Sequence, residues 1–387
     1  MVPRAWWFIP VEMSQGTEIL LTTPAVRTAR STSESEFVLN LDQKSGLVKF
    51  DTRDLMRAAS CEHCTRLAIA RTFSTEVAKE LEAFAPSQAP TLAMKYGIAY
   101  EEALQDELLE SLGPDLVRQP AVANSASATI DLMNEGAVVI YQGALRQEYA
   151  PLLLSVRPDF LVRADYDLVF VDGKLTAQQV PGREAKGYIV WDAKFGGTAK
   201  PAYLLQVALY IDALERIGLK AEGALHGLIL GDRSLSVFEE SEIVPAMLLA
   251  RENLAEQISA AKAAFDSDST ASLAAWSWDA LDKHCPTSDG CKICEYPDLC
   301  EADRIATDDL IRVANINRSQ IAKLRAAGIT TMRQLAEAAD SAAPTALTVA
   351  SFEKLRRQAK LQVAVESVTD SNGRFDPSKV EGWILSP

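Results

Sequence analysis

The residues best suited to chemistry are Asp192 and Lys194, which stand two positions apart in the run GYIVWDAKFGG at 187–197. The apolar residues around them are typical of a buried strand, in which side chains two positions apart share one face. Charged groups are rarely buried without a partner or a metal ion, because removing them from water is costly. A carboxylate can bind a metal ion while a neighbouring lysine steadies an activated water or a phosphate oxygen. The simpler alternative is a structural ion pair.

Four further polar residues occur in apolar surroundings. Asp159 follows a proline in another apolar run and could be a second metal-binding carboxylate, or an aspartate that flanks a turn. Glu101 lies in a predicted helix, where most glutamates face solvent. Gln206 and Tyr210 are four positions apart, so they share one face of a predicted helix. That face is otherwise apolar, which indicates a site or a polar seam, or else an ordinary amphipathic helix.

The elements that must position these residues can be predicted from periodicity and from turn residues. One predicted helix begins at Asp54 and runs past Cys61. Others cover Thr91–Leu112, Pro201–Ile217 and Val244–Phe265, and 308–362 is predicted to be purely helical, with breaks at Gly328 and Ser341–Pro344. The predicted strands are Phe37–Leu41, Val138–Leu145, Leu152–Val162, Leu168–Val171, 187–194 and Gly223–Leu230. Strands in succession flanked by helices predict a mixed α/β core.

In their order along the chain, these elements resemble the RecB-like branch of the PD-(D/E)xK nuclease superfamily. The shared features are a helix glutamate, a strand Pro-Asp, a strand Asp-x-Lys and a helix Gln-x-x-x-Tyr. The resemblance implies a restriction-endonuclease-like core in which Asp159, Asp192 and the backbone carbonyl of Ala193 bind Mg²⁺ or Mn²⁺. It also implies that Lys194 positions or activates the attacking water and that Glu101 is an acidic auxiliary.

The resemblance further implies that Gln206 and Tyr210 line the substrate channel. It includes one departure, because the family pattern has a metal-binding histidine directly before the helix glutamate and this chain has Tyr100 there. A neutral phenol is a poor ligand for Mg²⁺, so we expect Tyr100 to contact substrate and the metal to bind more weakly.

The six cysteines point to a second metal or cluster. They are Cys61, Cys64, Cys285, Cys291, Cys294 and Cys300. The apolar start of the chain is short and interrupted by proline, so we do not interpret it as a signal peptide and expect a reducing, cytoplasmic compartment. There, metal or cluster ligation is more common than disulfide formation.

The spacing Cys291-x2-Cys294-x5-Cys300, with Cys61 far upstream, resembles the iron–sulfur staple of AddB-type nuclease subunits and of CRISPR-associated RecB-like exonucleases. That resemblance implies a structural 4Fe–4S cluster held by these four thiolates. Cys64 and Cys285 then bind no cofactor. His63 and His284 are also not ligands, and we expect both to be solvated. The rival interpretation is a zinc site made of two C-x2-C pairs, at 61–64 and 291–294.

Charge is distributed unevenly along the chain. The net charge is −14, but 301–365 contains ten Lys or Arg against seven Asp or Glu. Within this segment, two helical patterns on either side of Gly328 resemble a helix-hairpin-helix, a motif that contacts phosphates without reading bases. A small helical bundle for internal packing is the alternative. No apolar run reaches the roughly 20 residues of a membrane span, so we expect no membrane association.

The sequence therefore predicts four parts: an N-terminal extension (1–52), a RecB-like nuclease domain (53–300), a helix-hairpin-helix-like domain (301–365) and a tail or linker (366–387). The expected activity is metal-dependent hydrolysis of single-stranded or end-containing DNA. A helicase or another nuclease supplied as a separate chain is a possible partner, since longer proteins with this arrangement continue into such domains. The main alternative is a non-catalytic nucleic-acid-binding protein built on a nuclease-like scaffold, and a zinc-stapled protein without a nucleic-acid role is a third.

Overall fold

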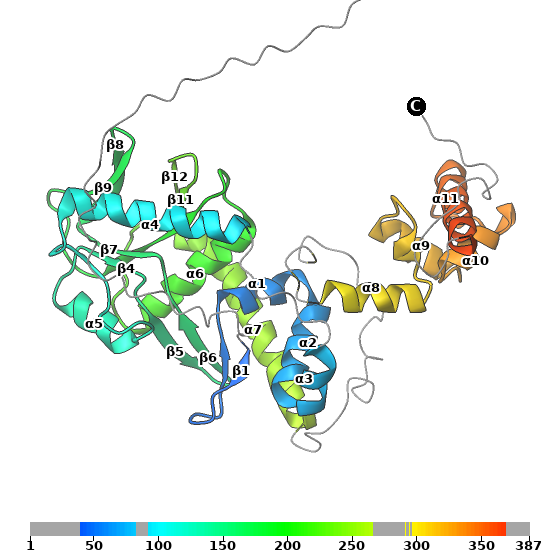
Figure 1. Ribbon diagram of the computed structural model, residues 1–387, viewed down its shortest axis with the longest axis horizontal. Helices are drawn as coiled ribbons and strands as arrows, with labels where there is room; N and C mark the ends of the chain where they lie inside the picture. The colour runs from blue at the N-terminus through cyan, green and yellow to red at the C-terminus, as the bar shows by residue number, and fades with distance from the viewer. Residues whose placement is uncertain (1–38, 83–91, 266–290, 292–293, 295, 369–387) are drawn as a thin grey trace, which may run out of the picture. The chain divides into compact units, whose positions relative to one another are not determined.

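The computed structural model describes residues 39–82, 92–265, 291, 294 and 296–368, and it has the predicted mixed α/β architecture (Figure 1). The described helices are α1 (Thr52–Ser60), α2 (Glu62–Phe73), α3 (Thr75–Glu82), α4 (Leu92–Leu112), α5 (Ala126–Asn134), α6 (Pro201–Arg216), α7 (Glu240–Phe265), α8 (Pro297–Ala306), α9 (Arg318–Ala326), α10 (Met332–Glu337) and α11 (Val349–Ser367). The strands are β1 (Asn40–Leu41), β2 (Val48–Phe50), β3 (Val117–Arg118), β4 (Val139–Tyr141), β5 (Leu145–Tyr149), β6 (Leu152–Val156), β7 (Phe160–Arg163), β8 (Tyr166–Val171), β9 (Lys174–Gln179), β10 (Tyr188–Lys194), β11 (His226–Leu230) and β12 (Leu235–Phe238).

The largest sheet has the strand order β12-β11-β10-β7-β4-β3, so the Asp-x-Lys strand β10 lies in its interior. β10 pairs in parallel with β11 and antiparallel with β7. A second sheet has the order β1-β2-β6-β5, and β8 and β9 form a separate hairpin. Residues Val48–Phe50 fall in the predicted N-terminal extension, yet as β2 they pair with β6.

Strand β10 separates two hydrophobic cores. Val190 packs in one core with residues of α6 and α7, whereas Ile189 and Trp191 pack in another with Leu104 and Leu108 of α4. Successive side chains of a strand point to opposite faces, which explains why neighbours in sequence enter different cores. The two helices predicted to carry site residues, α4 and α6, therefore cover opposite faces of this strand (Figure 1).

Two predicted elements are interrupted in the structure. The strand predicted at Leu152–Val162 is wrong as a continuous element, because Pro158 separates β6 from β7 and has no N–H to donate to a ladder. The chain changes sheets at this break, since β6 pairs with β2 and β5 whereas β7 pairs with β4 and β10. The helix predicted to run past Cys61 ends there, because Cys61 is extended and caps both α1 and α2. The strand predicted at Val138–Leu145 likewise divides into β4 and β5.

The C-terminal helices have a core of their own. Leu310, Leu324, Met332 and Phe352 are among its buried residues. Helices α9 and α10 flank Gly328, whose φ of 84° suits a residue without a side chain at the turn between them. The segment is not purely helical, since 3₁₀ turns occupy Leu310–Arg312 and Asp340–Ala342. Within the part of the chain that the structure describes, no helix is long and apolar enough to cross a membrane.

Candidate functional site

The pairing of β7 with β10 brings the two predicted metal-binding aspartates together. Phe160 pairs with Trp191, so Asp159, just before β7, lies next to the end of β10 that carries Asp192. The backbone N–H of Ala193 donates to Asp159 Oδ2 at 2.7 Å. The position of Asp159 is thus fixed by a main-chain contact to the strand that carries its partner.

Asp192 is fully buried and has partners from two elements. Its Oδ2 forms an ion pair with the ammonium of Lys194, which shares its strand face. From α6, Gln206 Nε2 donates to Asp192 Oδ1 at 3.2 Å and also contacts the hydroxyl of Tyr210 at 2.6 Å. The i, i+4 spacing of the glutamine and the tyrosine therefore produces one polar chain that ends on the buried carboxylate.

The electrostatics of this group are those of crowded negative charge around one cation. Burial raises the pKa of Asp159 well above its ordinary value, and the charges of Asp192 and Glu101 raise it further. Burial alone would lower the pKa of Lys194, but Asp192 and Asp159 outweigh this effect and raise that pKa. Lys194 is therefore an ammonium ion here. Burial, with the same two aspartates, also raises the pKa of Tyr210, so its phenol stays protonated.

Gln142 is a residue of the site that the sequence did not reveal. It has a φ of 49°, unusual for a side chain of its kind, and its backbone N–H donates to the carbonyl of Asp159 at 2.8 Å. Its amide Nε2 donates to Glu101 Oε1 and contacts the hydroxyl of Tyr141 at 3.1 Å. Gln142 thus connects the buried glutamate of α4 to the β7 side of the site.

The side chain of Tyr100 contacts the backbone at the end of the sheet. Its hydroxyl donates to the backbone carbonyl of Leu230, at the end of β11. Burial raises its pKa, although the nearby Arg233 acts in the opposite direction. Arg233 lies 5.8 Å from the ring centroid and donates to both oxygens of Glu107 at 2.8 and 2.7 Å. The phenol of Tyr100 therefore ties α4 to the end of the sheet.

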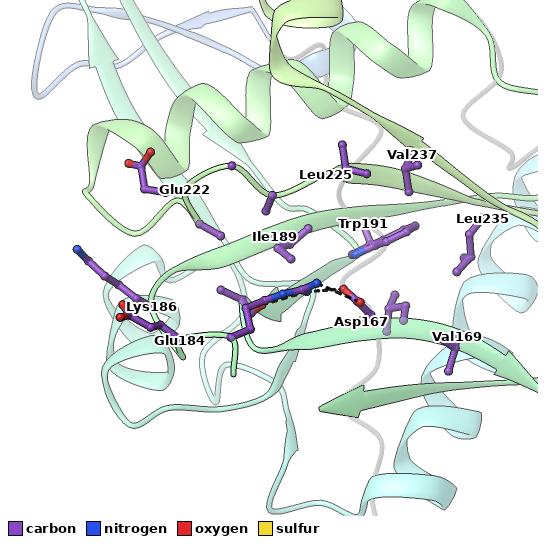
Figure 2. Close-up of a pocket in the computed structure, with 16 residues that line it drawn as sticks. Asp167, Val169, Glu184, Lys186, Ile189, Trp191, Glu222, Leu225, Leu235 and Val237 are labelled. Carbon is purple, nitrogen blue, oxygen red and sulfur yellow. Dashed lines mark hydrogen bonds and ion pairs between the residues drawn. The ribbon is translucent and has the colours of Figure 1, made fainter. Parts of the chain in front are cut away.

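A pocket of about 710 Å³ lies on the other side of β10. Figure 2 shows Ile189 and Trp191 of β10 lining it together with Val237 and Asp167. Asp167 forms an ion pair with Arg183 at 2.6 Å. None of the predicted catalytic residues lines this pocket, because Asp192 and Lys194 project from the opposite face of the strand. This pocket is therefore separate from the carboxylate group.

Among the cysteines, the clearest contact involves a residue that we took for a bystander. Cys64 Sγ lies 3.4 Å from Cys294 Sγ, across 230 positions of sequence. Cys61 Sγ accepts the backbone N–H of Cys64 at 3.4 Å, and Cys294 Sγ accepts that of Tyr296 at 3.3 Å. The contact with Cys294, together with burial, raises the pKa of the Cys64 thiol.

For the other described cysteines and for His63, the structure gives the degree of burial. Cys291 is partly buried, and Cys300 is buried in α8. His63 was expected to be solvated, but it is partly buried and burial lowers its pKa. Cys285 and His284 lie outside the described residues.

Asp159, Asp192 and Glu101 crowd carboxylates at the end of β10, and burial together with the charges of Asp192 and Glu101 raises the pKa of Asp159. In the arrangement described for 39–82, 92–265, 291, 294 and 296–368, however, no three His, Cys, Asp or Glu side chains form a group that could hold a metal ion. Comparison of the chain with protein-family models, with curated proteins and with solved structures gave no significant match.

Proposed function

We propose that this protein is a divalent-metal-dependent deoxyribonuclease with a PD-(D/E)xK, RecB-like core. The observation that supports this function is the meeting of Asp159, Asp192 and Lys194 at the end of two paired strands. A purely structural ion pair would need one carboxylate and one ammonium. Here a second aspartate and Glu101 lie close enough to Asp192 that burial and their mutual repulsion disfavour the charged form of Asp159. A bound divalent cation would let these carboxylates ionise together.

Each residue has a role that follows from its contacts. Asp159, Asp192 and the carbonyl of Ala193 would hold Mg²⁺ or Mn²⁺, because hard cations prefer oxygen ligands. The ion stabilises charge on a phosphate and lowers the pKa of a bound water. Lys194 keeps its proton, so it orients the attacking water and stabilises developing negative charge; it does not act as a base.

The remaining residues hold this set in place. Gln206 and Tyr210 orient Asp192 from α6, because the amide contacts both the carboxylate and the phenol. Glu101, held by Gln142, is an acidic auxiliary on the other side of the site.

The decisive experiment is DNA cleavage by the full chain with and without a divalent ion. The wild type should degrade single-stranded or end-containing DNA in Mg²⁺ or Mn²⁺ and lose this activity in EDTA. Asp192→Ala should abolish cleavage, whereas Asp167→Ala, an exposed carboxylate of the separate pocket, should not change it. Equal residual cleavage by the wild type and Asp192→Ala with each metal would reject the enzyme and favour the non-catalytic DNA-binding alternative.

For the cysteines, we infer a structural 4Fe–4S cluster held by Cys61, Cys291, Cys294 and Cys300. The Cys64–Cys294 contact is a specific observation in favour of the alternative, a zinc site made of the two C-x2-C pairs. The two cofactors predict opposite results. A cluster gives about four iron and four sulfide per chain, which Cys300→Ser removes and Cys64→Ser does not. Zinc gives one ion per chain, which is lost in Cys64→Ser and kept in Cys300→Ser.

The C-terminal helices supply the proposed contact to the DNA backbone. Helices α9 and α10 and the Gly328 turn are the parts that resemble a helix-hairpin-helix. Basic residues Lys354, Arg357 and Lys360 of α11 line a concavity of about 390 Å³ in the same helical segment. Such contacts position DNA without sequence readout. We also propose a cytoplasmic location, and a helicase or second nuclease as a partner chain.

A further inference from the structure

The surface beside the carboxylate group carries an unusual aromatic pair. Tyr96 of α4 and Phe195, the residue after β10, are 53% and 54% exposed. Among the aromatic side chains whose exposure the structure describes, they are the only two in the exposed class. Their rings stack on each other, with centroids 5.7 Å apart and planes 13° from parallel. Exposing two large aromatic rings to water is unfavourable, and such exposed apolar surface is typical of a binding site.

The Tyr96–Phe195 pair packs against the end of the sheet. Tyr100 packs its ring edge-on against Phe195 at 6.1 Å, while its hydroxyl is bonded to the carbonyl of Leu230. Gly231 lies so close that a Cβ there would be 1.9 Å from the carbonyl oxygen of Phe195. Its N–H also donates to the carbonyl of Gly196 at 3.2 Å. The backbone that carries Phe195 is therefore fixed, and the exposed ring is presented by a rigid support.

The position of the pair relative to the charged residues is set by the strand. Lys194 and Phe195 are neighbours, so their side chains leave the strand end in opposite directions. Lys194 lies over the ring of Tyr203 from α6 at 5.2 Å, whereas Phe195 lies against the aromatic side chains of α4. The ring pair and the carboxylate group thus stand at the same end of β10, on opposite sides of the strand and on residues adjacent in sequence. A nucleotide next to the one at the carboxylates could place its base on the rings.

We propose that Phe195 and Tyr96 form a stacking subsite for one unpaired nucleobase next to the reacting phosphodiester. The biological purpose of this subsite rests on the proposed nuclease function, whereas its ability to bind a base does not. Every base has a π-face, so the platform accepts any base, and it favours purines because they cover more of the exposed ring. A base inside a duplex has both faces covered by its neighbours. The platform therefore selects single strands and frayed ends.

The test measures binding in EDTA, where no cleavage is needed. The probes are short single-stranded DNA oligonucleotides, one with a central purine and one with an abasic nucleotide at the same place. Phe195→Leu keeps an apolar side chain and removes the flat face, whereas Phe195→Trp keeps and enlarges it. Leu249→Ala on α7, an apolar side chain that is 60% exposed, is the matched control.

The expected result is a loss that depends on the base. Phe195→Leu should weaken binding of the purine oligonucleotide about tenfold, the usual scale for loss of one aromatic–base stack. It should not change binding of the abasic oligonucleotide, and Phe195→Trp should bind the purine at least as well as wild type. Leu249→Ala should bind both probes like wild type.

The outcomes separate the subsite from the nuclease. If Phe195→Leu weakens both probes equally, or neither, or if the wild type binds no single strand, the subsite is wrong. Cleavage that depends on Asp192 could still be observed in each of these cases. If base-dependent binding is present but no metal supports cleavage, the subsite stands and the nuclease proposal fails. A second protein that occupied this surface would leave wild-type and variant DNA affinities equal, which is the refuting result.

Discussion

His226 makes the stability of strand β10 depend on pH. It is fully buried at the start of β11, and its Nδ1 accepts the backbone N–H of Val190 in β10 at 3.0 Å. Burial, with a smaller effect of the charge on Lys220, lowers its pKa from 6.5 to about 4. Near its other nitrogen lies the carboxylate of Glu240, at 3.7 Å and already paired with Lys220 at 2.7 Å. Protonating Nδ1 would also remove the acceptor for Val190.

The size of the effect follows from the two pKa values. Because the folded pKa is lower than the unfolded one, the unfolded state binds the proton more tightly, and stability is lost as pH falls through the window from 6.5 to 4. Above pH 6.5 neutral His226 makes its full contribution to the free energy of unfolding. For one group, the free energy of unfolding should fall by about 2 kcal/mol at pH 5 and by about 3 kcal/mol at pH 4.

The assay is hydrogen exchange of the β10 amides, followed by mass spectrometry and corrected for the intrinsic effect of pH on exchange. His226→Asn keeps an acceptor for the N–H of Val190 but does not titrate in this range. The variant should be less stable at neutral pH, because the ring is replaced by a smaller group. The difference between wild type and variant should shrink by about 3 kcal/mol as pH falls to 4. Other titrating groups are common to both proteins and cancel. A difference that stays constant from pH 7 to pH 4 would refute the reasoning.

Three other predictions concern the site and the C-terminal helices. Lys194→Met keeps the aliphatic stem and removes the charge, and it should lower the cleavage rate by about 10²-fold or more, measured in single turnover, without changing the metal content of the cysteine site. Gly231→Ala places a Cβ 1.9 Å from the carbonyl oxygen of Phe195 and should destabilise the fold by at least ~2 kcal/mol in urea titration; unchanged stability would mean that the end of β10 can move. Deleting 305–387 should weaken DNA binding and reduce the slope of log affinity against log salt, since phosphate contacts release counterions. An unchanged slope would make that segment structural only.

The predicted grouping of Asp159, Asp192 and Lys194 came from the family resemblance, which was itself carried by local patterns that the structure keeps. An apolar strand with two charges on one face and an apolar helix with an i, i+4 polar pair are signals within a few residues. The helix predicted at Thr91–Leu112 is present as α4, which ends before Gly113 at a φ of 83°. Such features require no knowledge of distant partners.

What the sequence did not reveal depends on contacts between distant segments. Gln142 joins the site only because its backbone has an unusual conformation and because α4 brings Glu101 within reach. The choice between Cys61 and Cys64 depends on which of them faces Cys294, which is 230 positions from Cys64. The exposure of Phe195 follows from the end of the sheet. The predicted strand Leu168–Val171 lies within β8, but its hairpin partner β9 and strand β12 were missed, because their half-exposed residues lack a clear alternation.

The antiparallel pairing of β7 with β10 has a consequence for how this chain can tolerate insertions. The distance between the two aspartates is set by the register Phe160–Trp191. The chain between these strands only has to connect the end of β7 to the start of β10. The β8–β9 hairpin in that connection turns at Asp172 and Gly173, both with positive φ, and can lengthen there without moving either carboxylate. One extra residue inside β10 would instead send Lys194 to the opposite face from Asp192. The hairpin tip is thus a place where an inserted tag or domain would leave the arrangement of Asp159 and Asp192 intact.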